Sequence, residues 1–302
     1  MNDRISIAMA TFNGSKFLRE QLESIYAQSQ QPDEVVVSDD CSTDDTVSIL
    51  QEYKESHGLR YAINTHNLGF TRNFENAIRM TTGEYVLLSD QDDIWIQDKI
   101  RILYKTIKEK EKLNPNLPGL ICTHTINVDE NGIESSRTVS SEKGWDYLLY
   151  AHFTQGCTLI MNRKLIQVAL PIPEDIMYDV YLGMVAAMCG FWYNNGLPLV
   201  KYRCHGANVM NKRIKRTDTH GVLPYILGES RFDTMRIIEK YCGKMFLPDK
   251  VGLFQRIYSY SYVKKWWQRI FIAISFKHKP ISAKLKSIIQ IVKEQVCCID
   301  SA

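Results

Sequence analysis

Short apolar segments alternate with helix-like segments through the first part of the chain, and this alternation limits the fold more than any other feature. Four segments have the length and composition of buried strands: Ile5 to Ala10, Glu34 to Ser38, Arg60 to Asn64 and Glu84 to Ser89. Between them, apolar residues recur at the spacing of one helix face. Such alternation is typical of parallel β-α units whose sheet is covered on both faces. The sequence therefore predicts an α/β fold.

Helix starts lie between these strands. Gly14 and Ser15 precede one periodic helix, and the run Ser42 to Asp45 has capping-box spacing for the next. A third helix is expected from Asn73 to Met80. Each helix would connect two successive parallel strands, which cannot be joined by a tight turn.

The pattern changes after Gly119. Further strands are predicted at Leu120 to Val128, Cys157 to Asn162 and Leu199 to His205, and a helix from about Asp179 to Cys189. Because strands and helices no longer alternate regularly, the second half of the sheet is expected to contain both parallel and antiparallel strands.

The chain is expected to divide into an α/β domain over residues 1–215, with halves 1–118 and 119–215, and a helical region over 216–302. Charge is uneven between these parts. The net charge is +3, yet residues 250–302 carry ten Lys or Arg against two Asp or Glu. A basic tail of this kind either meets an anionic partner or forms a solvated face.

Several classes of protein are excluded by missing patterns. The chain has no G-x-G-x-x-G, no G-x-x-x-x-G-K-[ST] and no G-x-S-x-G, which argues against dinucleotide dehydrogenases, P-loop NTPases and serine hydrolases. Its eight cysteines form no C-x-x-C pair and indicate reduced thiols of the cytoplasm, not a zinc site. The apolar run Ile270 to Phe276 is too short to span a bilayer, which needs about 20 residues.

Polar clusters follow each of the four early strands. Their sequences are TFNG, DDCSTDD, HNLGFTRN and DQDD, and they begin at Thr11, Asp39, His66 and Asp90. In open α/β sheets, ligands bind beyond the carboxyl ends of the strands. Four consecutive polar strand ends therefore predict one binding site.

The acidic group Asp90, Asp92 and Asp93 has two interpretations. Adjacent carboxylates behind a buried strand raise one another's pKa unless a cation neutralises them, and oxygen ligands suit Mg²⁺ or Mn²⁺. The alternative is an N-terminal cap for a helix that begins near Gln97. The three other polar strand ends favour the cation.

Asp39 and Asp40 form a second acidic pair at a strand end. They could cap the helix expected near Thr43. If Ser42 takes the cap position, both aspartates are left to accept hydrogen bonds from a nucleobase or a ribose.

Five motifs in order resemble those of glycosyltransferase family 2, nucleotide-sugar transferases of the GT-A fold. They are ISIAMATFNGSKFLREQLESIYAQSQQPDEVVVSDDCSTDDT, NLGFTRNF, TGEYVLLSDQDDIW, FTQGCTLIMNRKL and YDVYLGMVAAMCGFWYNNGLPLVKYRCHGANV. The form DQDDIW is similar to that of the branch with bacterial rhamnosyltransferases. The resemblance spans about residues 4 to 210. It implies a Rossmann-like mixed sheet with flanking helices, and a C-terminal helical extension.

The resemblance also implies roles for individual residues. Those assigned to the nucleotide are Ala10, Thr11, Phe12, Asn13, Asp40, Arg72, Asn73, Asp90 and Gln91. Those assigned to a Mn²⁺ or Mg²⁺ ion that bridges the diphosphate are Asp92, Asp90 and His205. A lone histidine is more often structural, so a structural role for His205 stays open.

The catalytic base is assigned by the same resemblance to Asp179, at the position of the branch's H-D motif. Its alternative role is a charge partner for the N-terminus of its helix. Where the H-D motif of the branch has a histidine, this chain has Tyr178. This difference affects the expected acceptor pocket more than the expected reaction. The expected donor and acceptor pocket contains Asp93, Trp95, Gly156, Cys157, Tyr178 and Arg203. For Gly156 we expect close backbone approach to a ligand.

The basic C-terminal region interleaves Trp266, Trp267, Phe271 and Phe276 with Lys and Arg. As a helix it would suit an anionic membrane surface, or it could pack on the catalytic domain. Basic and aromatic residues can also bind nucleic acid, but no other feature supports that partner. We expect a cytoplasmic protein, with this region at the inner face of the cell membrane.

The function implied by the resemblance is an inverting, metal-dependent glycosyltransferase of bacterial surface polysaccharide assembly, such as O-antigen or capsule. The donor would be a nucleotide-diphosphate sugar, either dTDP-rhamnose or a UDP-hexose, and the acceptor a saccharide or a lipid-linked glycan. Two alternatives remain. The first is a nucleotidyltransferase that makes sugar nucleotides; such enzymes have a G-x-G-T-R-type loop after the first strand, and the segment TFNG lacks that pattern. The second is a non-catalytic nucleotide-sugar-binding protein.

Overall fold

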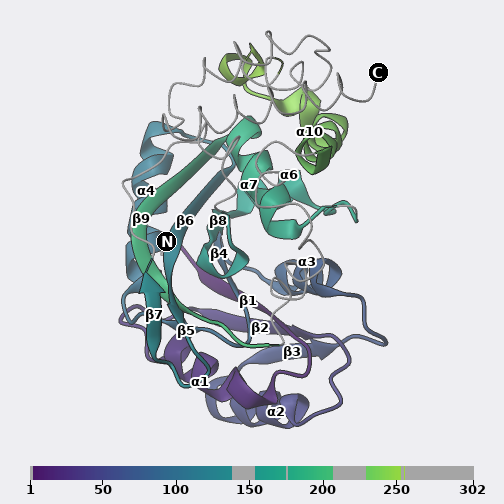
Figure 1. Ribbon diagram of the computed structural model, residues 1–302. Coiled ribbons are helices and arrows are strands. Elements are labelled where there is room, and N and C mark those ends of the chain that lie inside the picture. Colours follow the sequence, from purple (N-terminus) through teal and green to yellow (C-terminus); the bar gives the residue numbers. More distant parts are fainter. Residues whose placement is uncertain (1–2, 138–153, 175, 207–228, 253–254, 256–302) are drawn as a thin grey trace, which may run out of the picture.

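The computed structural model of the protein describes residues 3–137, 154–174, 176–206, 229–252 and 255. A mixed sheet of nine strands runs through this part of the chain. Along the sheet the strands follow the order β3-β2-β1-β4-β8-β6-β9-β5, and β7 pairs with β6 outside this path. Figure 1 shows the sheet curling between helices on its two sides.

The first half of the sheet is parallel. Strand β1 (Ile5–Thr11) pairs with β2 (Glu34–Asp39) on one side and with β4 (Tyr85–Ser89) on the other, and β3 (Arg60–Ile63) extends the sheet beyond β2. The parallel sheet predicted from the alternation is confirmed. Its four carboxyl ends therefore open toward the same edge.

The second half is mixed, also as predicted. Strand β8 (Ile160–Asn162) is antiparallel to β4 and to β6 (Gly119–Val128), whereas β9 (Phe191–Arg203) is parallel to β6. Two short strands complete it, each antiparallel to its neighbour: β5 (Ile94–Trp95) beside β9 and β7 (Glu134–Arg137) beside β6.

Two predicted strand boundaries in this half are wrong. Cys157 belongs to a 3-10 turn, η1 (Gly156–Thr158), so the predicted strand from Cys157 is only β8. Strand β9 begins at Phe191, well before the predicted Leu199. Its first part contains Gly196, with φ 75°, and shifts register against β6, so turn-like residues lie inside a bulged strand.

Each face of the sheet carries its own hydrophobic core. On one face pack α1 (Ser15–Tyr26), α2 (Thr46–His57) and α4 (Lys99–Leu113). On the other pack α3 (Phe70–Met80), α6 (Arg163–Ala169) and α7 (Tyr178–Cys189). Residues of β1 alternate between the two cores because successive strand side chains point to opposite faces. Figure 1 shows α4 on one side of the sheet and α3, α6 and α7 on the other.

The described C-terminal segments dock against α7. Helix α10 (Glu229–Cys242) places Ile238 and Cys242 in the core that contains α7, and a 3-10 turn, η2 (Gly243–Met245), follows. The buried Lys250 then donates through Nζ to the carbonyl oxygens of Ala187, at 2.6 Å, and of Gly190. These bonds satisfy carbonyl groups at the end of α7 that lack helical partners.

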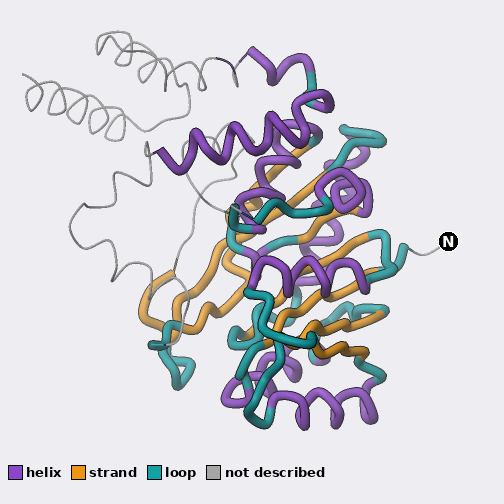
Figure 2. The backbone as a smooth tube through the Cα atoms, turned by 90° about the vertical axis from the view of Figure 1, so that its right-hand side faces the viewer, coloured by secondary structure: helices purple, strands orange, loops and turns teal. Residues whose placement is uncertain are grey.

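Figure 2 shows the same arrangement from the side, with the strands side by side among the helices. The predicted boundary between 1–215 and 216–302 stays a prediction. The basic and aromatic stretch with Trp266, Trp267, Phe271 and Phe276 lies outside the described residues. Among the helices that the structure does describe, none combines the length and apolar character needed to cross a membrane.

Candidate active site

The DQDD segment forms the connection between β4 and β5, at the carboxyl end of the parallel strands. Gln91 fastens it to the end of β1: its Oε1 accepts from the Phe12 N–H at 2.8 Å, and its Nε2 donates to the Phe12 carbonyl oxygen at 3.1 Å. A side chain at Gly14 would overlap the Gln91 amide, so glycine makes room for this contact. The predicted convergence of these two strand ends is confirmed.

Asp93 is not a helix cap. Strand β5 follows it directly, and α4 begins only at Lys99, with Asp98 in the N-cap position. Asp93 is fully buried, and its Oδ1 accepts from the Arg203 backbone N–H at 3.2 Å. Its Oδ2 is buried without a nitrogen or oxygen partner among the described residues. A buried carboxylate oxygen without such a partner is costly, and the Cys157 side chain is a further hydrogen-bond partner of the Asp93 carboxylate.

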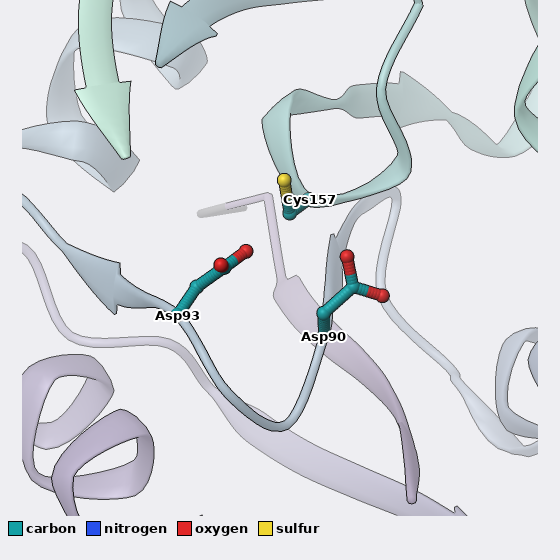
Figure 3. A group of neighbouring side chains, drawn as sticks. All are labelled: Asp90, Asp93 and Cys157. Carbon is teal, nitrogen blue, oxygen red and sulfur yellow. The ribbon is translucent and has the colours of Figure 1, made fainter. Parts of the chain in front are cut away.

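Asp90, Asp93 and Cys157 form a cluster of candidate metal ligands. One carboxylate oxygen of each aspartate and the Cys157 Sγ all lie within 4.8 Å of one another. Figure 3 shows the three side chains as neighbours, Asp90 and Asp93 from the DQDD segment and Cys157 from η1. Burial, together with the charge of Asp92, raises the pKa of Asp93 to about 7. Burial and the charge of Asp93 raise the pKa of Asp90 well above its usual value.

Asp92 contacts His205. Their Oδ2 and Nε2 atoms are 2.8 Å apart, and the two side chains are only 17% and 10% exposed. An octahedral ion with ligand distances of about 2.0–2.1 Å holds neighbouring ligands about 3 Å apart. The contact therefore fits two ligands of one ion. Two members of the predicted metal set, Asp92 and His205, are therefore in contact. The third member, Asp90, is grouped instead with Asp93 and Cys157, which the sequence assigned to a pocket.

Lys99 is a functional candidate that sequence reasoning missed. Its side chain is fully buried, its Nζ donates to the Cys157 carbonyl oxygen at 2.6 Å, and the Nζ lies 3.3 Å from the centroid of the Trp95 ring. Burial lowers the pKa of Lys99 to about 7, against the charges of Asp93 and Asp90, which raise it. A sequence signal existed: Lys99 shares a helical face with the buried residues Leu103 and Ile107.

Arg203 holds the DQDD segment from behind. Its side chain is 2% exposed. The guanidinium donates to the carbonyl oxygens of Asp92 at 3.0 Å and Glu130 at 2.7 Å, and pairs with the Glu20 carboxylate. Arg203 therefore supports the DQDD segment from within the protein. Its side chain does not present an open surface to the pocket that it was predicted to line. Trp95, also expected in the pocket, is 3% exposed and lies in the core with Lys99 over its ring.

The aspartates after β2 are engaged within the protein. Asp39 accepts from the hydroxyls of Thr11 at 2.7 Å and Ser42 at 2.6 Å. Asp40 accepts from the backbone N–H groups of Leu68 at 2.8 Å and Gly69 at 2.9 Å. The expectation that Ser42 caps the next helix is wrong, because α2 begins at Thr46. Both carboxylates therefore have partners within the protein. The prediction that Asp39 and Asp40 are left over to bind a nucleobase or a ribose did not foresee these partners.

The remaining residues predicted to bind nucleotide differ in their surroundings. Phe12 is 45% exposed at the end of β1, whereas Thr11 is buried and Ala10 half-buried. Asn13 has φ 47°, and its Oδ1 accepts from the Thr43 N–H at 2.8 Å. Asn73 is buried and donates to the Thr11 carbonyl oxygen at 3.0 Å. Phe12 and Asn13 are the exposed members of this set, and Phe12 offers an aromatic ring to solvent.

Arg72 is directed to the segment before α7. Its guanidinium pairs with Glu75 at 2.6 Å and with Glu174 at 3.0 Å, and it donates to the Ile172 carbonyl oxygen at 2.9 Å. These contacts join α3 to the chain that leads into α7. The structure therefore connects Arg72 with the second half of the predicted α/β domain, residues 119–215.

Tyr178 and Asp179 lie in the first turn of α7. Tyr178 is buried and stacks on Phe74, with ring centroids 4.2 Å apart. A Cβ on Gly156 would overlap the Tyr178 hydroxyl, so the close approach expected at Gly156 is made by Tyr178. Asp179 is near enough to Asp90 for its charge to raise the pKa of Asp90. The candidate base therefore acts electrostatically on Asp90.

Comparison with known proteins identifies relatives of this arrangement. The chain is 29% identical over 223 residues to the dTDP-rhamnosyl transferase RfbG of Shigella flexneri, covering 68% of this chain and 74% of RfbG. It is 28% identical to an uncharacterized protein of Mycobacterium tuberculosis, over 58% of this chain, and spans only half of that relative's length.

Solved structures agree on the fold. The structure of residues 1–349 of Staphylococcus aureus TarS, in complex with UDP-GlcNAc, superposes with a TM-score of 0.62 at 20% identity and covers 90% of this chain and 80% of that one. Likeness at this identity supports the GT-A fold alone. The model of the family described as "Glycosyl transferase family 2" matches residues 6–166, more than half of the chain. The chain belongs to glycosyl transferase family 2.

Proposed function

We propose that the protein is an inverting, divalent-metal-dependent glycosyltransferase that uses a nucleoside-diphosphate sugar. The observation that carries this proposal is the contact of Asp92 with His205 at 2.8 Å, in the segment that follows the parallel strand β4. Carboxylates and an imidazole at this edge fit a Mn²⁺ or Mg²⁺ ion together with a diphosphate. When bound, such an ion acts as a Lewis acid that stabilises charge on the departing nucleoside diphosphate.

The proposed donor is dTDP-rhamnose, with a UDP-hexose as the second candidate. RfbG, which aligns with 68% of this chain, is named a dTDP-rhamnosyl transferase. TarS, which shares the fold, is a poly(ribitol-phosphate) β-N-acetylglucosaminyltransferase solved with UDP-GlcNAc. In either case the exposed ring of Phe12 is available to the nucleobase, and the buried Asp40 would act by fixing the loop that precedes α3.

The proposed base is Asp179. It lies in the first turn of α7, where its Oδ1 accepts from the Val180 N–H at 2.8 Å. The Asp179 carboxylate would accept the proton of the acceptor hydroxyl as that oxygen attacks the anomeric carbon and the diphosphate leaves from the opposite face. General-base assistance of this kind contributes about 10²–10⁴-fold in rate. The charge of Asp179, which contributes to the raised pKa of Asp90 after burial, Asp93 and Asp92, supports this assignment.

The acceptor is proposed to be a saccharide or a lipid-linked glycan of a bacterial surface polysaccharide. The support is the match to RfbG and the basic, aromatic composition of residues 250–302. That composition would bring the enzyme to the anionic inner face of the cell membrane, where lipid-linked acceptors are accessible.

Thermal-shift measurements with nucleotide sugars, with and without Mn²⁺, test the proposed function. We expect dTDP-rhamnose to raise the Tm more than UDP-GlcNAc, and only when Mn²⁺ is present. Incubation with a glycan acceptor should then release dTDP. Stabilisation by every nucleotide sugar without turnover on any acceptor would instead indicate a binding protein, and no stabilisation by any of them would contradict the proposal.

A further inference from the structure

Lys99 is a buried cation next to a buried acidic cluster. Its Nζ has two close partners among the described residues, the Cys157 carbonyl oxygen at 2.6 Å and the Trp95 ring at 3.3 Å from the centroid. Neither partner carries a negative charge. A fully buried ammonium group is costly unless nearby charges offset it.

The charges that offset it come from the group of Asp90, Asp93 and Cys157. Lys99 Nζ contacts the Cys157 backbone at 2.6 Å, and the Cys157 Sγ lies within 4.8 Å of a carboxylate oxygen of both aspartates. Asp93 is itself fully buried, with an Oδ2 that has no nitrogen or oxygen partner among the described residues. Lys99 also links two segments that are far apart in sequence, because α4 carries it and η1 carries Cys157. The same η1 turn carries the Cys157 side chain, which Figure 3 shows as a neighbour of the two aspartates.

We propose that Lys99 is a positioning residue that serves as the internal counter-cation of the acidic cluster, holding it together without metal and weakening metal binding. The second half of this statement rests on the proposed function. A divalent ion at Asp90 and Asp92 would be repelled by the nearby ammonium group. The repulsion makes the ion easier to release with the nucleoside diphosphate after each transfer.

Lys250 offers a matched comparison. It is also buried and also donates through Nζ to carbonyl oxygens, those of Ala187 and Gly190. These groups lie at the end of α7 opposite to Asp179. A helix of twelve residues is about 18 Å long, so Lys250 is remote from the cluster. Loss of Lys250 removes a buried lysine and its carbonyl contacts and leaves the cluster unchanged.

The first test measures Tm in metal-free protein. Lys99→Gln can retain a hydrogen bond to the Cys157 carbonyl oxygen but lacks the charge. We expect it to lower the Tm by roughly 5–10 °C, because the buried aspartates lose their compensation. Adding Asp93→Asn should restore at least half of that loss, since the double variant removes one charge of each sign. If the two losses simply add, Lys99 has no special coupling to Asp93 and the proposal fails.

The second test measures Mn²⁺ affinity without nucleotide or turnover, by titration calorimetry. Lys99→Gln should bind Mn²⁺ about tenfold more tightly than the unaltered protein, whereas Lys250→Gln should bind it equally well. Unchanged or weaker binding by Lys99→Gln would overturn the proposed repulsion. If Lys99→Gln does not fold, the double variant with Asp93→Asn must fold for the proposal to stand.

The two tests separate this proposal from the proposed function. If the unaltered protein binds no Mn²⁺ at all, the metal-dependent function fails, and with it the repulsion. The metal-free coupling of Lys99 to Asp93 is still decided by the Tm measurements.

Discussion

Asp92 and His205 are 113 positions apart in the chain, yet Asp92 Oδ2 and His205 Nε2 lie 2.8 Å from each other. The antiparallel pairing of β5 with β9 explains this contact. Ile94 is paired with Lys201, so the residues before β5 are carried to those after β9. Arg203 strengthens the junction by donating to the Asp92 carbonyl oxygen at 3.0 Å. The arrangement leads to the following predictions.

Asp92→Ala should abolish metal-dependent transfer while leaving the fold intact. Loss of a group that stabilises transition-state charge typically costs about 10²–10³-fold in kcat. Because Asp92 is partly exposed and its carboxylate pairs only with His205 among the described residues, the Tm should change by no more than a few degrees. Steady-state kinetics and calorimetry measure both effects. Glu52→Ala, which breaks an exposed pair with Arg19, is the control and should alter neither.

His205→Gln should weaken Mn²⁺ binding by roughly 10-fold, as expected for the loss of one group that ligates or orients ligands at a metal site. Titration calorimetry measures this directly. His57→Gln alters an exposed histidine on α2 and should leave the affinity unchanged. Equal Mn²⁺ affinity in His205→Gln and the unaltered protein would leave His205 with a purely structural role beside Phe17, whose ring is 5.1 Å away.

Asp179→Asn should lower kcat by about 10²–10⁴-fold, with little change in the KM for the donor or in Mn²⁺ affinity. Asparagine retains the hydrogen bond to the Val180 N–H but cannot take a proton at neutral pH. If Asp179 only complements the N-terminus of α7, the substitution would cost about 0.3–1 kcal/mol of stability and leave kcat nearly unchanged. Kinetics and thermal unfolding of one variant distinguish the two roles.

Gly156→Ala should destabilise the protein by roughly 1–3 kcal/mol, because the added methyl group would overlap the Tyr178 hydroxyl. Tyr178→Phe removes that hydroxyl, so the double variant should recover part of the loss. Denaturant unfolding of the two single variants and the double variant measures the coupling. Strict additivity would show that Gly156 and Tyr178 do not constrain each other.

The parallel half of the fold could be predicted almost entirely from sequence. Strands β1, β2 and β4 lie within one residue of the segments expected from their apolar runs, because buried parallel strands read as continuous hydrophobic stretches. The convergence of their polar ends followed from the general rule for open sheets. Helix starts were less reliable: the capping-box spacing at Ser42 is real, but its hydroxyl bonds to Asp39 instead.

The less predictable features are those set by contacts between distant segments. No local pattern shows that β5 and β9 pair, and that pairing determines which carboxylate meets His205. Lys99 reads as an ordinary charged residue of a helix until the fold encloses it between Trp95 and η1. Gly156 was expected to admit the close approach of a ligand, and only the fold shows that the Tyr178 hydroxyl lies against it.

The central claim is that Asp92 and His205 hold the ion of a nucleotide-sugar site, and anomalous diffraction from crystals grown with Mn²⁺ and dTDP tests it most directly. We predict one strong anomalous peak within about 2.5 Å of both the Asp92 carboxylate and His205 Nε2, with the diphosphate beside it. A peak bound elsewhere, or dTDP seated at the strand ends with no ion between Asp92 and the diphosphate, would contradict the claim.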